Sequence, residues 1–296
     1  FIMNKKEEFV KYVNGRKNDI PPKLDKLRVM TFNVHAFKDA NDNLIDPKLY
    51  IQLFDHIDPD IIALQECDLI YFDENLRDYF KNFQTFSFYE ADYKNFGNIV
   101  ISKFLSTSND QTFEFPKFVK QSKIKKRCTN NISFKIPNEG NDITLSNVHL
   151  EVKDLVSKNS NYFSDKNALR KIQVNEAILH NYSNNFILLG DFNDNDKLIK
   201  YIKKQKGLVS VFDKYFEIHN EMPRFTSIYD KIIDYIFIPK CSNLKIGNVF
   251  IYYTTISDHL PVVCDFSFGK MDDIYQCKSK KNWHLSRYQP KQIYKI

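Results

Sequence analysis

Nine apolar segments of strand type recur along the chain, and the way they are connected restricts the fold. They cover residues 27–34, 60–66, 98–103, 128–136, 142–150, 186–192, 231–239, 248–255 and 260–268. Short apolar runs bounded by polar residues are typical of buried strands. Several of these strands follow one another without an intervening helix, as in 128–150 and 232–268. This order favours packed sheets with flanking helices (an α/β chain of the α+β kind) over a simple doubly wound parallel sheet.

Three segments have helical periodicity, at residues 5–13, 46–57 and 165–182. The second has Asp46 as a plausible N-cap and Pro47 at the first helical position. Its predicted apolar face consists of Leu49, Leu53, Phe54 and Ile57. In the third helix, Leu169, Ile172, Ile178 and Leu179 share the face. We divide the chain into an N-terminal extension (1–26), one main domain (27–269) and a basic tail (270–296).

Composition excludes several classes of protein. The 26 Phe and 17 Tyr are too many for a disordered chain, and no apolar stretch approaches the 18 residues of a membrane span. No apolar segment typical of a secretory signal follows Phe1. The five cysteines are scattered, without a CxxC pair, which predicts reduced thiols and an intracellular location.

Polar side chains gather where the predicted strands end. Asn33 and His35, Gln65 and Glu66, Asn147 and His149, and Asp191 and Asn193 each follow a strand, Asp258 and His259 precede the last one, and Asp234 lies inside another. Each group alone is typical of a turn, a cap or a structural histidine. Together they offer oxygen ligands for a hard divalent cation and imidazoles for phosphate oxygens. With no zinc-type Cys/His set, P-loop or GxSxG elbow in the sequence, this inventory points to phosphoryl transfer.

The net charge of +6 is unevenly distributed. Residues 1–28 and 270–296 carry an excess of Lys and Arg, whereas residues 29–269 are mildly acidic. Within that acidic part, residues 117–127 hold five lysines and Arg127 without a single acid. A basic segment of this kind suits a polyanionic partner, because neutralising phosphates releases counterions.

Seven motifs, in order, resemble those of the endonuclease/exonuclease/phosphatase superfamily, the DNase I-like phosphodiesterases. They are TFNVH (31–35), ALQE (63–66), GNIVISK (97–103), NVHLE (147–151), GDFN (190–193), IDYIF (233–237) and SDHLPV (257–262). GDFN and SDHLPV are the specific ones, and the series spans nearly the whole chain. The resemblance implies a four-layer sandwich, in which two packed mixed β-sheets are flanked by helices. It also makes 27–269 the catalytic domain and Mg²⁺ the cofactor, with Mn²⁺ as the alternative ion.

The same resemblance assigns roles to individual residues. Glu66 would be the principal metal ligand, with Asn33 beside it and Asp258 near the metal. Asp191 would activate the attacking water, Asn193 would help to hold that water, and His149 would stabilise charge on phosphorus. His259, paired with Asp234, would contact the scissile phosphate. Residues on the substrate side would be His35, Asn98, Asn147 and Thr226, although for Asn98 and Thr226 a structural role is the favoured interpretation. The basic segment 117–127 adds Lys126 and Arg127, because its place after the strand 98–103 predicts a loop near the cleft that could hold a phosphate backbone.

The substrate is less constrained than the chemistry. Abasic-site endonucleases carry Asp where this chain has His35, and a Tyr/Asn pair where it has NVHLE. The chain is more similar to the branch of deadenylases, 5′-tyrosyl-DNA phosphodiesterases, sphingomyelinases and bacterial hydrolases. Its positive charge favours a nuclease or an enzyme that processes nucleic-acid ends, with DNA or RNA as partner. A phospholipid, a small phosphate ester and an inactive nucleic-acid-binding scaffold are the alternatives, and the sequence does not identify a protein partner.

Overall fold

The computed structural model describes residues 2–23, 26–91, 93–107, 111–114, 128–137, 142–152, 167–179 and 183–269. Two six-stranded sheets make up its centre, with strand orders β11-β12-β1-β2-β4-β3 and β5-β6-β7-β8-β10-β9. The strands are β1 (Leu27–Asn33), β2 (Ile61–Asp68), β3 (Thr85–Glu90), β4 (Phe96–Ser102), β5 (Gln111–Glu114), β6 (Cys128–Lys135), β7 (Asp142–His149), β8 (Phe186–Asp191), β9 (Leu208–Ser210), β10 (Asp234–Pro239), β11 (Leu244–Ile251) and β12 (Val262–Phe268). The helices are α1 (Ile2–Asn14), α2 (Pro47–Ile57), α3 (Leu69–Asn75), α5 (Ala168–Leu179), α6 (Lys197–Gln205) and α7 (Val211–His219), with 3-10 turns η1 (His35–Phe37) and η2 (Tyr79–Asn82).

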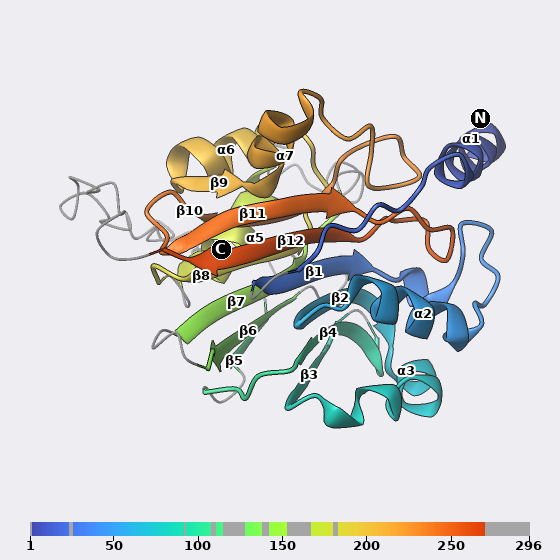
Figure 1. The fold of residues 1–296 in the computed structure, drawn as a ribbon, viewed down its shortest axis with the longest axis horizontal. Coiled ribbons are helices and arrows are strands. Elements are labelled where there is room, and N and C mark those ends of the chain that lie inside the picture. The colour runs from blue at the N-terminus through green and yellow to red at the C-terminus, as the bar shows by residue number, and fades with distance from the viewer. Residues whose placement is uncertain are drawn as a thin grey trace, which may run out of the picture.

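The two sheets pack face to face, and helices cover their outer faces (Figure 1). Helices α2 and α3 bury Leu53 and Phe72 in one core with Phe32 of the first sheet. The second core contains apolar residues of both sheets together with residues of α5, α6 and α7. Each sheet is mixed, because β1–β2 and β7–β8 are parallel whereas their other neighbours are antiparallel. The predicted four-layer sandwich of two mixed sheets flanked by helices is therefore confirmed.

Local signals explain where the predicted helices lie and where the prediction was wrong. Helix α2 begins where expected, with the Asp46 carboxylate accepting a hydrogen bond from the Lys48 backbone N–H. Leu49, however, is 42% exposed, and Tyr50 takes its place on the buried face. The third predicted helix corresponds to α5, and residues 165–166 and 180–182 of the predicted range lie outside the described residues. Leu179, which we placed on its apolar face, is 45% exposed.

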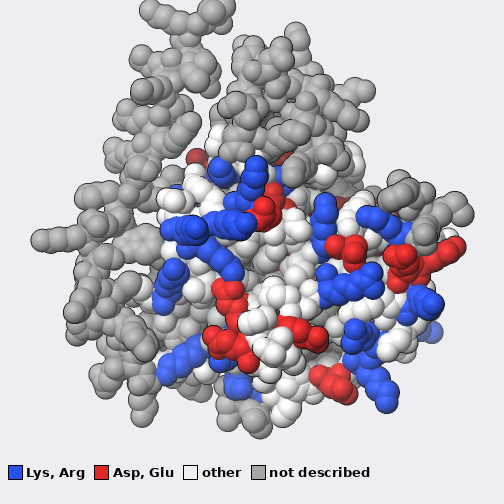
Figure 2. Space-filling view, turned by 90° about the horizontal axis from the view of Figure 1, so that it is seen from above, with Lys and Arg blue, Asp and Glu red and all other residues white. Residues whose placement is uncertain are grey.

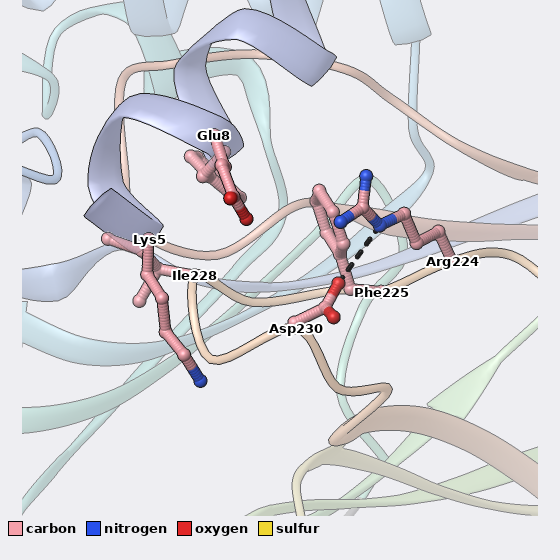
Figure 3. A pocket seen from close by; sticks show the side chains of 7 residues that line it. Lys5, Glu8, Arg224, Phe225, Ile228 and Asp230 are labelled. Carbon is pink, nitrogen blue, oxygen red and sulfur yellow. Dashed lines mark hydrogen bonds and ion pairs between the residues drawn. The ribbon is translucent and has the colours of Figure 1, made fainter. Parts of the chain in front are cut away.

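Helix α1 packs onto the domain. Its residues Phe9 and Val13 are buried in the core that the two sheets share. The rings of Phe9 and Phe225 lie 5.4 Å apart, and Figure 3 shows α1 beside the loop that carries Arg224 and Asp230. A cavity of only about 40 Å³ remains between α1 and that loop. Helix α1 therefore supports a loop that leads into the polar cluster described below.

The cysteines depart from the expectation at one position. Cys67 and Cys264 are free, as predicted, and both are buried. Cys241, however, is disulfide-bonded, so the prediction of reduced thiols was wrong for this residue. A disulfide is typical of oxidising compartments, and the inference of an intracellular location therefore loses part of its support. The described helices are all too short or too polar to cross a bilayer.

Candidate active site

Strand register in the second sheet places three predicted site residues side by side. Asp191, at the end of β8, is paired with His149 of β7 on one side and with Asp234 of β10 on the other. The preceding Gly190 has a φ of +134°, and a Cβ there would lie 1.9 Å from the Val148 carbonyl oxygen. Only glycine permits this close approach of β8 to β7. The glycine of the GDFN motif therefore allows Asp191 to lie next to His149.

The first sheet contributes Asn33 and Glu66. Glu66 lies in a β-bulge, because the β2–β4 register shifts between Leu64 and Cys67. Its φ of +55° is uncommon for a residue other than glycine. Bulges often re-aim a side chain next to an active site, and here the carboxylate of Glu66 reaches Asn33 at the end of β1. Strain at a position of this kind is typical of functional sites.

The two sheets meet through the amide of Asn33. Its Nδ2 donates to Glu66 Oε1 and to Asp191 Oδ2, each at 3.1 Å. His149 Nε2 lies 3.5 Å from the same Glu66 oxygen and 3.7 Å from the same Asp191 oxygen. Glu66, His149 and Asp191 thus offer ligand atoms within 4.8 Å of one another. The two carboxylate oxygens fit a hard cation such as Mg²⁺, since such ions prefer oxygen ligands. Asn33 faces them with its NH2 group, while its Oδ1 accepts a hydrogen bond from the His35 N–H.

A second group, Asp191, Asp234 and His259, is close enough for a metal but is better explained as an ion pair. His259 Nδ1 lies 2.9 Å and 3.1 Å from the two carboxylate oxygens of Asp234. Burial lowers the pKa of His259, but the carboxylates of Asp234 and Asp258 outweigh it and raise this pKa well above its usual value. The imidazolium is therefore a hydrogen-bond donor at neutral pH. Its Nε2 faces Asp191 and Asp258, at 3.9 Å and 4.0 Å.

Asp191 is held in a defined orientation and has a perturbed pKa. Its Oδ1 accepts a hydrogen bond from the Asn193 backbone N–H at 2.8 Å, which leaves Oδ2 toward Asn33. Burial, followed by repulsion from Asp234, raises the pKa of Asp191 to about 7, although His259 acts in the opposite direction. A carboxylate with such a pKa can accept a proton near neutral pH. Asn193 itself has a φ of +50°, and its side-chain amide donates to the Leu150 carbonyl.

The structure places the remaining predicted residues at different distances from this centre. Thr226 is fully buried, and its hydroxyl donates to Asp234 Oδ2 at 2.6 Å, so it positions Asp234. Asn147 is likewise buried and joins the sheets by hydrogen bonds to Gln65 and to the carbonyls of Leu64 and Ile99. The hydrogen bonds of Thr226 and Asn147 are therefore made within the protein and give both residues a structural role.

Asp258 and His35 lie beside the centre. His35 Nδ1 is 3.6 Å from Asp258 Oδ1, and Asp258 belongs to neither of the two candidate metal groups. Asn98 is 1% exposed, and both polar atoms of its side chain lack a hydrogen-bond partner in the described part of the chain. Lys126 and Arg127 lie outside the described residues.

Two features near the site were not assigned a role from the sequence. Tyr229 is 57% exposed as a residue. Partial burial of its phenol, followed by the carboxylates of Asp258 and Glu66, raises the pKa of this group. Arg170 is completely buried, pairs with Asp194 at 2.9 Å and donates to the Asn193 carbonyl. It thereby fixes the loop that follows Asp191. The motif spacing predicts α5, but only the packed fold turns this arginine toward that loop.

Comparisons with known proteins identify the family and the fold. Residues 30–259 match the model of the Endonuclease/Exonuclease/phosphatase family. The catalytic domain of human Nocturnin, solved with a bound sulfate anion, is 17% identical, with a TM-score of 0.64 over 85% of this chain and 100% of that one. An endonuclease/exonuclease/phosphatase from Beutenbergia cavernae is 18% identical (TM-score 0.60; 82% of this chain and 72% of that one). TDP2 from D. rerio, complexed with a single-strand DNA product, is 16% identical (TM-score 0.57; 82% and 99%).

Identities this low show a shared fold only, and no protein in a curated set matches the chain significantly. The family match is stronger, because it covers most of the chain and includes six of the seven motifs in full and SDHLPV as far as His259. The chain therefore belongs to the endonuclease/exonuclease/phosphatase family, whose members are hydrolases that act on phosphate esters.

Proposed function

We propose that this chain is a divalent-metal-dependent phosphodiesterase that acts on nucleic acid. The observation that carries the proposal is the arrangement around Asp191. Its carboxylate lies between the Asn33–Glu66 pair on one side and the Asp234–His259 pair on the other. A hard cation and an imidazolium can therefore face the same phosphate from two sides, which is what phosphoryl transfer requires.

The residues divide the chemistry as follows. Asp191 accepts the proton of the attacking water, whose oxygen forms the new bond to phosphorus. The ester P–O bond breaks, and the leaving oxygen takes a proton from solvent water and departs as an alcohol. His259, held by Asp234, donates from Nε2 to a phosphate oxygen. His149 stabilises the charge that develops on phosphorus from the side of Glu66. Mg²⁺ held by Glu66, beside Asn33, would act as a Lewis acid on the phosphate when bound.

Nucleic acid is the proposed substrate class for two reasons. TDP2 and Nocturnin share the fold, and TDP2 was solved with single-strand DNA. The sequence also has a net charge of +6 and the basic segment 117–127. On the face seen in Figure 2, lysines and arginines alternate with acids. That view of the described residues therefore supports contacts with individual phosphates more than one continuous basic surface.

The proposal is tested by cleavage of a small substrate panel in Mg²⁺. The panel holds single- and double-stranded DNA, RNA, an abasic duplex, a 5′-phosphotyrosyl oligonucleotide and sphingomyelin. We expect cleavage of at least one nucleic acid, which EDTA and Glu66→Gln should abolish. Glu74→Gln, which changes an exposed acid on α3, is the matched control and should remain active. Activity on sphingomyelin alone would disprove the nucleic-acid proposal.

A metal at this site should also be visible in the stability of the protein. Glu66, Asp191, Asp234 and Asp258 place like charges close together, and a bound cation would offset their repulsion. A ligand at 100 times its Kd stabilises the folded state by about 2.7 kcal/mol. We therefore expect Mg²⁺ to raise the Tm of the wild-type protein by several degrees and to have little effect on Glu66→Gln. Equal shifts in the two proteins would place the metal elsewhere.

A further inference from the structure

A cavity of about 400 Å³ borders the acid–imidazole cluster, with Glu66 in its lining. It is lined by residues 93–96 at the turn from β3 into β4, by Asp68 and Ile70 where α3 begins, and by His35, Ala36 and Lys38 after β1. Its volume falls within the range of roughly 300–1,000 Å³ that is typical of small-molecule sites. A ligand in this cavity would reach the candidate metal site through Glu66.

One wall of the cavity is apolar and exposed. The rings of Tyr93 and Phe96 lie 5.2 Å apart at an interplanar angle of 48°. Tyr93 is 56% exposed and Ile70, also in the lining, is 53% exposed. Large apolar side chains that remain exposed beside a cleft often mark a binding site. An exposed aromatic ring next to a phosphoesterase centre is suited to stack against a planar base.

This wall is held in place before any ligand binds. The Phe96 N–H donates to the Tyr93 carbonyl at 3.2 Å, which closes the turn between β3 and β4. The Leu69 N–H donates to the Asn95 carbonyl at 2.8 Å and so ties this turn to the start of α3. The Asn95 N–H donates in turn to a carboxylate oxygen of Glu90. Binding therefore requires little ordering of the wall, which favours affinity.

Two cations line the same cavity. Lys38 and Lys94 lie on opposite loops, and neither forms an ion pair with any carboxylate among the described residues. Asp68, which also lines the cavity, accepts hydrogen bonds from the Ile70 and Tyr71 N–H groups at the start of α3. Its charge is therefore partly satisfied within the protein. The two lysines remain available for an anion.

From this combination we propose that the cavity is a nucleotide subsite. The base of a nucleotide next to the scissile phosphate stacks on Tyr93, and its adjoining phosphate pairs with Lys38 and Lys94. This inference rests on the proposed function, because it identifies which part of a nucleic-acid substrate this side of the site holds. A phosphocholine headgroup would bring a cation close to both lysines, so charge favours the nucleotide.

Calorimetric titration of the full chain in Mg²⁺ tests the subsite without requiring turnover. The ligands are AMP, ribose 5-phosphate, which lacks the base, and phosphocholine. We expect AMP to bind more tightly than ribose 5-phosphate by about 5- to 150-fold, the range for one base–aromatic stack. Tyr93→Ala should remove this difference, whereas Phe216→Ala, which truncates a similarly exposed aromatic ring on α7, should preserve it. Equal affinities for the two phosphates, or tighter binding of phosphocholine, would overturn the proposal.

Kinetics with the best oligonucleotide substrate separate the subsite from the chemistry. Tyr93→Ala should raise KM with little change in kcat, and should leave hydrolysis of methyl p-nitrophenyl phosphate unchanged, because that ester has no base. Lys94→Gln should weaken the salt dependence of oligonucleotide binding by about one phosphate contact, whereas Lys81→Gln should not. If nucleic acid is cleaved but Tyr93→Ala leaves KM unchanged, the subsite is wrong and the proposed function stands. If nothing in the substrate panel is cleaved, the proposed function fails, and calorimetry still decides the subsite.

Discussion

Asp191→Asn should lower kcat by at least about 100-fold at saturating Mg²⁺ and substrate. Loss of a positioned general base typically costs 10²–10⁴ in rate. Asparagine keeps the shape of the side chain, and its Oδ1 can still accept the hydrogen bond from the Asn193 N–H. Its NH2 group cannot accept the second bond, from Asn33 Nδ2, and the side chain cannot take a proton from water. Asp78→Asn, which changes an exposed acid, is the control. Near-normal turnover by Asp191→Asn would show that another group is the base.

The same variant has an informative effect on stability. Burial and Asp234 raise the pKa of Asp191 to about 7 in the folded, metal-free protein, whereas an unfolded aspartate titrates near about 3.9. The folded state therefore binds this proton more tightly, and the group costs stability as pH rises from about 4 to 7. In EDTA, Asp191→Asn should thus become more stable relative to wild type over that window. A variant that loses both activity and stability would instead indicate misfolding.

Much of the site could be predicted from the sequence because it lies at strand ends. His149, Asp191 and Asp234 are adjacent as a result of strand pairing, and each belongs to a motif whose strand is visible as an apolar run. The glycine that permits their close approach, Gly190, is also visible in GDFN. At these positions the strand pattern in the sequence agrees with the arrangement of the strands in the folded protein, as is usual where a sequence specifies one fold.

Other parts of the site have no local signal. Glu66 adopts a positive φ, although its motif ALQE contains no glycine that would indicate a bulge. His35, Ala36 and Phe37 form a left-handed turn that also lacks glycine. Such a turn costs roughly 1–2 kcal/mol per residue, so long-range packing must hold it. Phe37 is fully buried and stacks on Tyr71 at 4.5 Å. The geometry of these residues depends on contacts with α3, which lies more than thirty positions away along the chain.

The short helices and the cavity were missed for related reasons. Helices α3, α6 and α7 have nine residues or fewer, too few to establish a clear periodicity. Helix α7 nevertheless carries a signal in its sequence, since Ser210 and Asp213 form a capping box. The cavity beside Glu66 brings together three loops that have no motif in common. Only the folded chain places Lys38 and Lys94 on the same site.

The largest expected change in stability lies at the other end of the first sheet. Arg28, at the start of β1, and Asp265 of β12 are both almost completely buried. Arg28 Nε and Nη2 donate to the two carboxylate oxygens of Asp265 at 2.7 Å and 3.0 Å. Its Nη1 and Nη2 also donate to the carbonyls of Ile57 and Pro21. The pair therefore links the base of the sheet to α2 and to the segment that precedes β1.

Asp265→Ala should lower the free energy of unfolding by about 3–5 kcal/mol, because it leaves the buried guanidinium without its counter-charge. Asp73→Ala, on α3, breaks an exposed pair with Arg77, which follows that helix, and should cost no more than about 0.5 kcal/mol. Urea unfolding of both variants measures the difference. Arg28→Met combined with Asp265→Leu removes both charges and should recover most of the loss, which attributes the cost to the unpaired charge and not to the truncated side chain.

Asn33, at the opposite end of β1, should keep its geometry in Asp265→Ala, so kcat measured well below the Tm should remain unchanged. A fall in kcat at full folding would show that the base of the sheet and the active site are coupled.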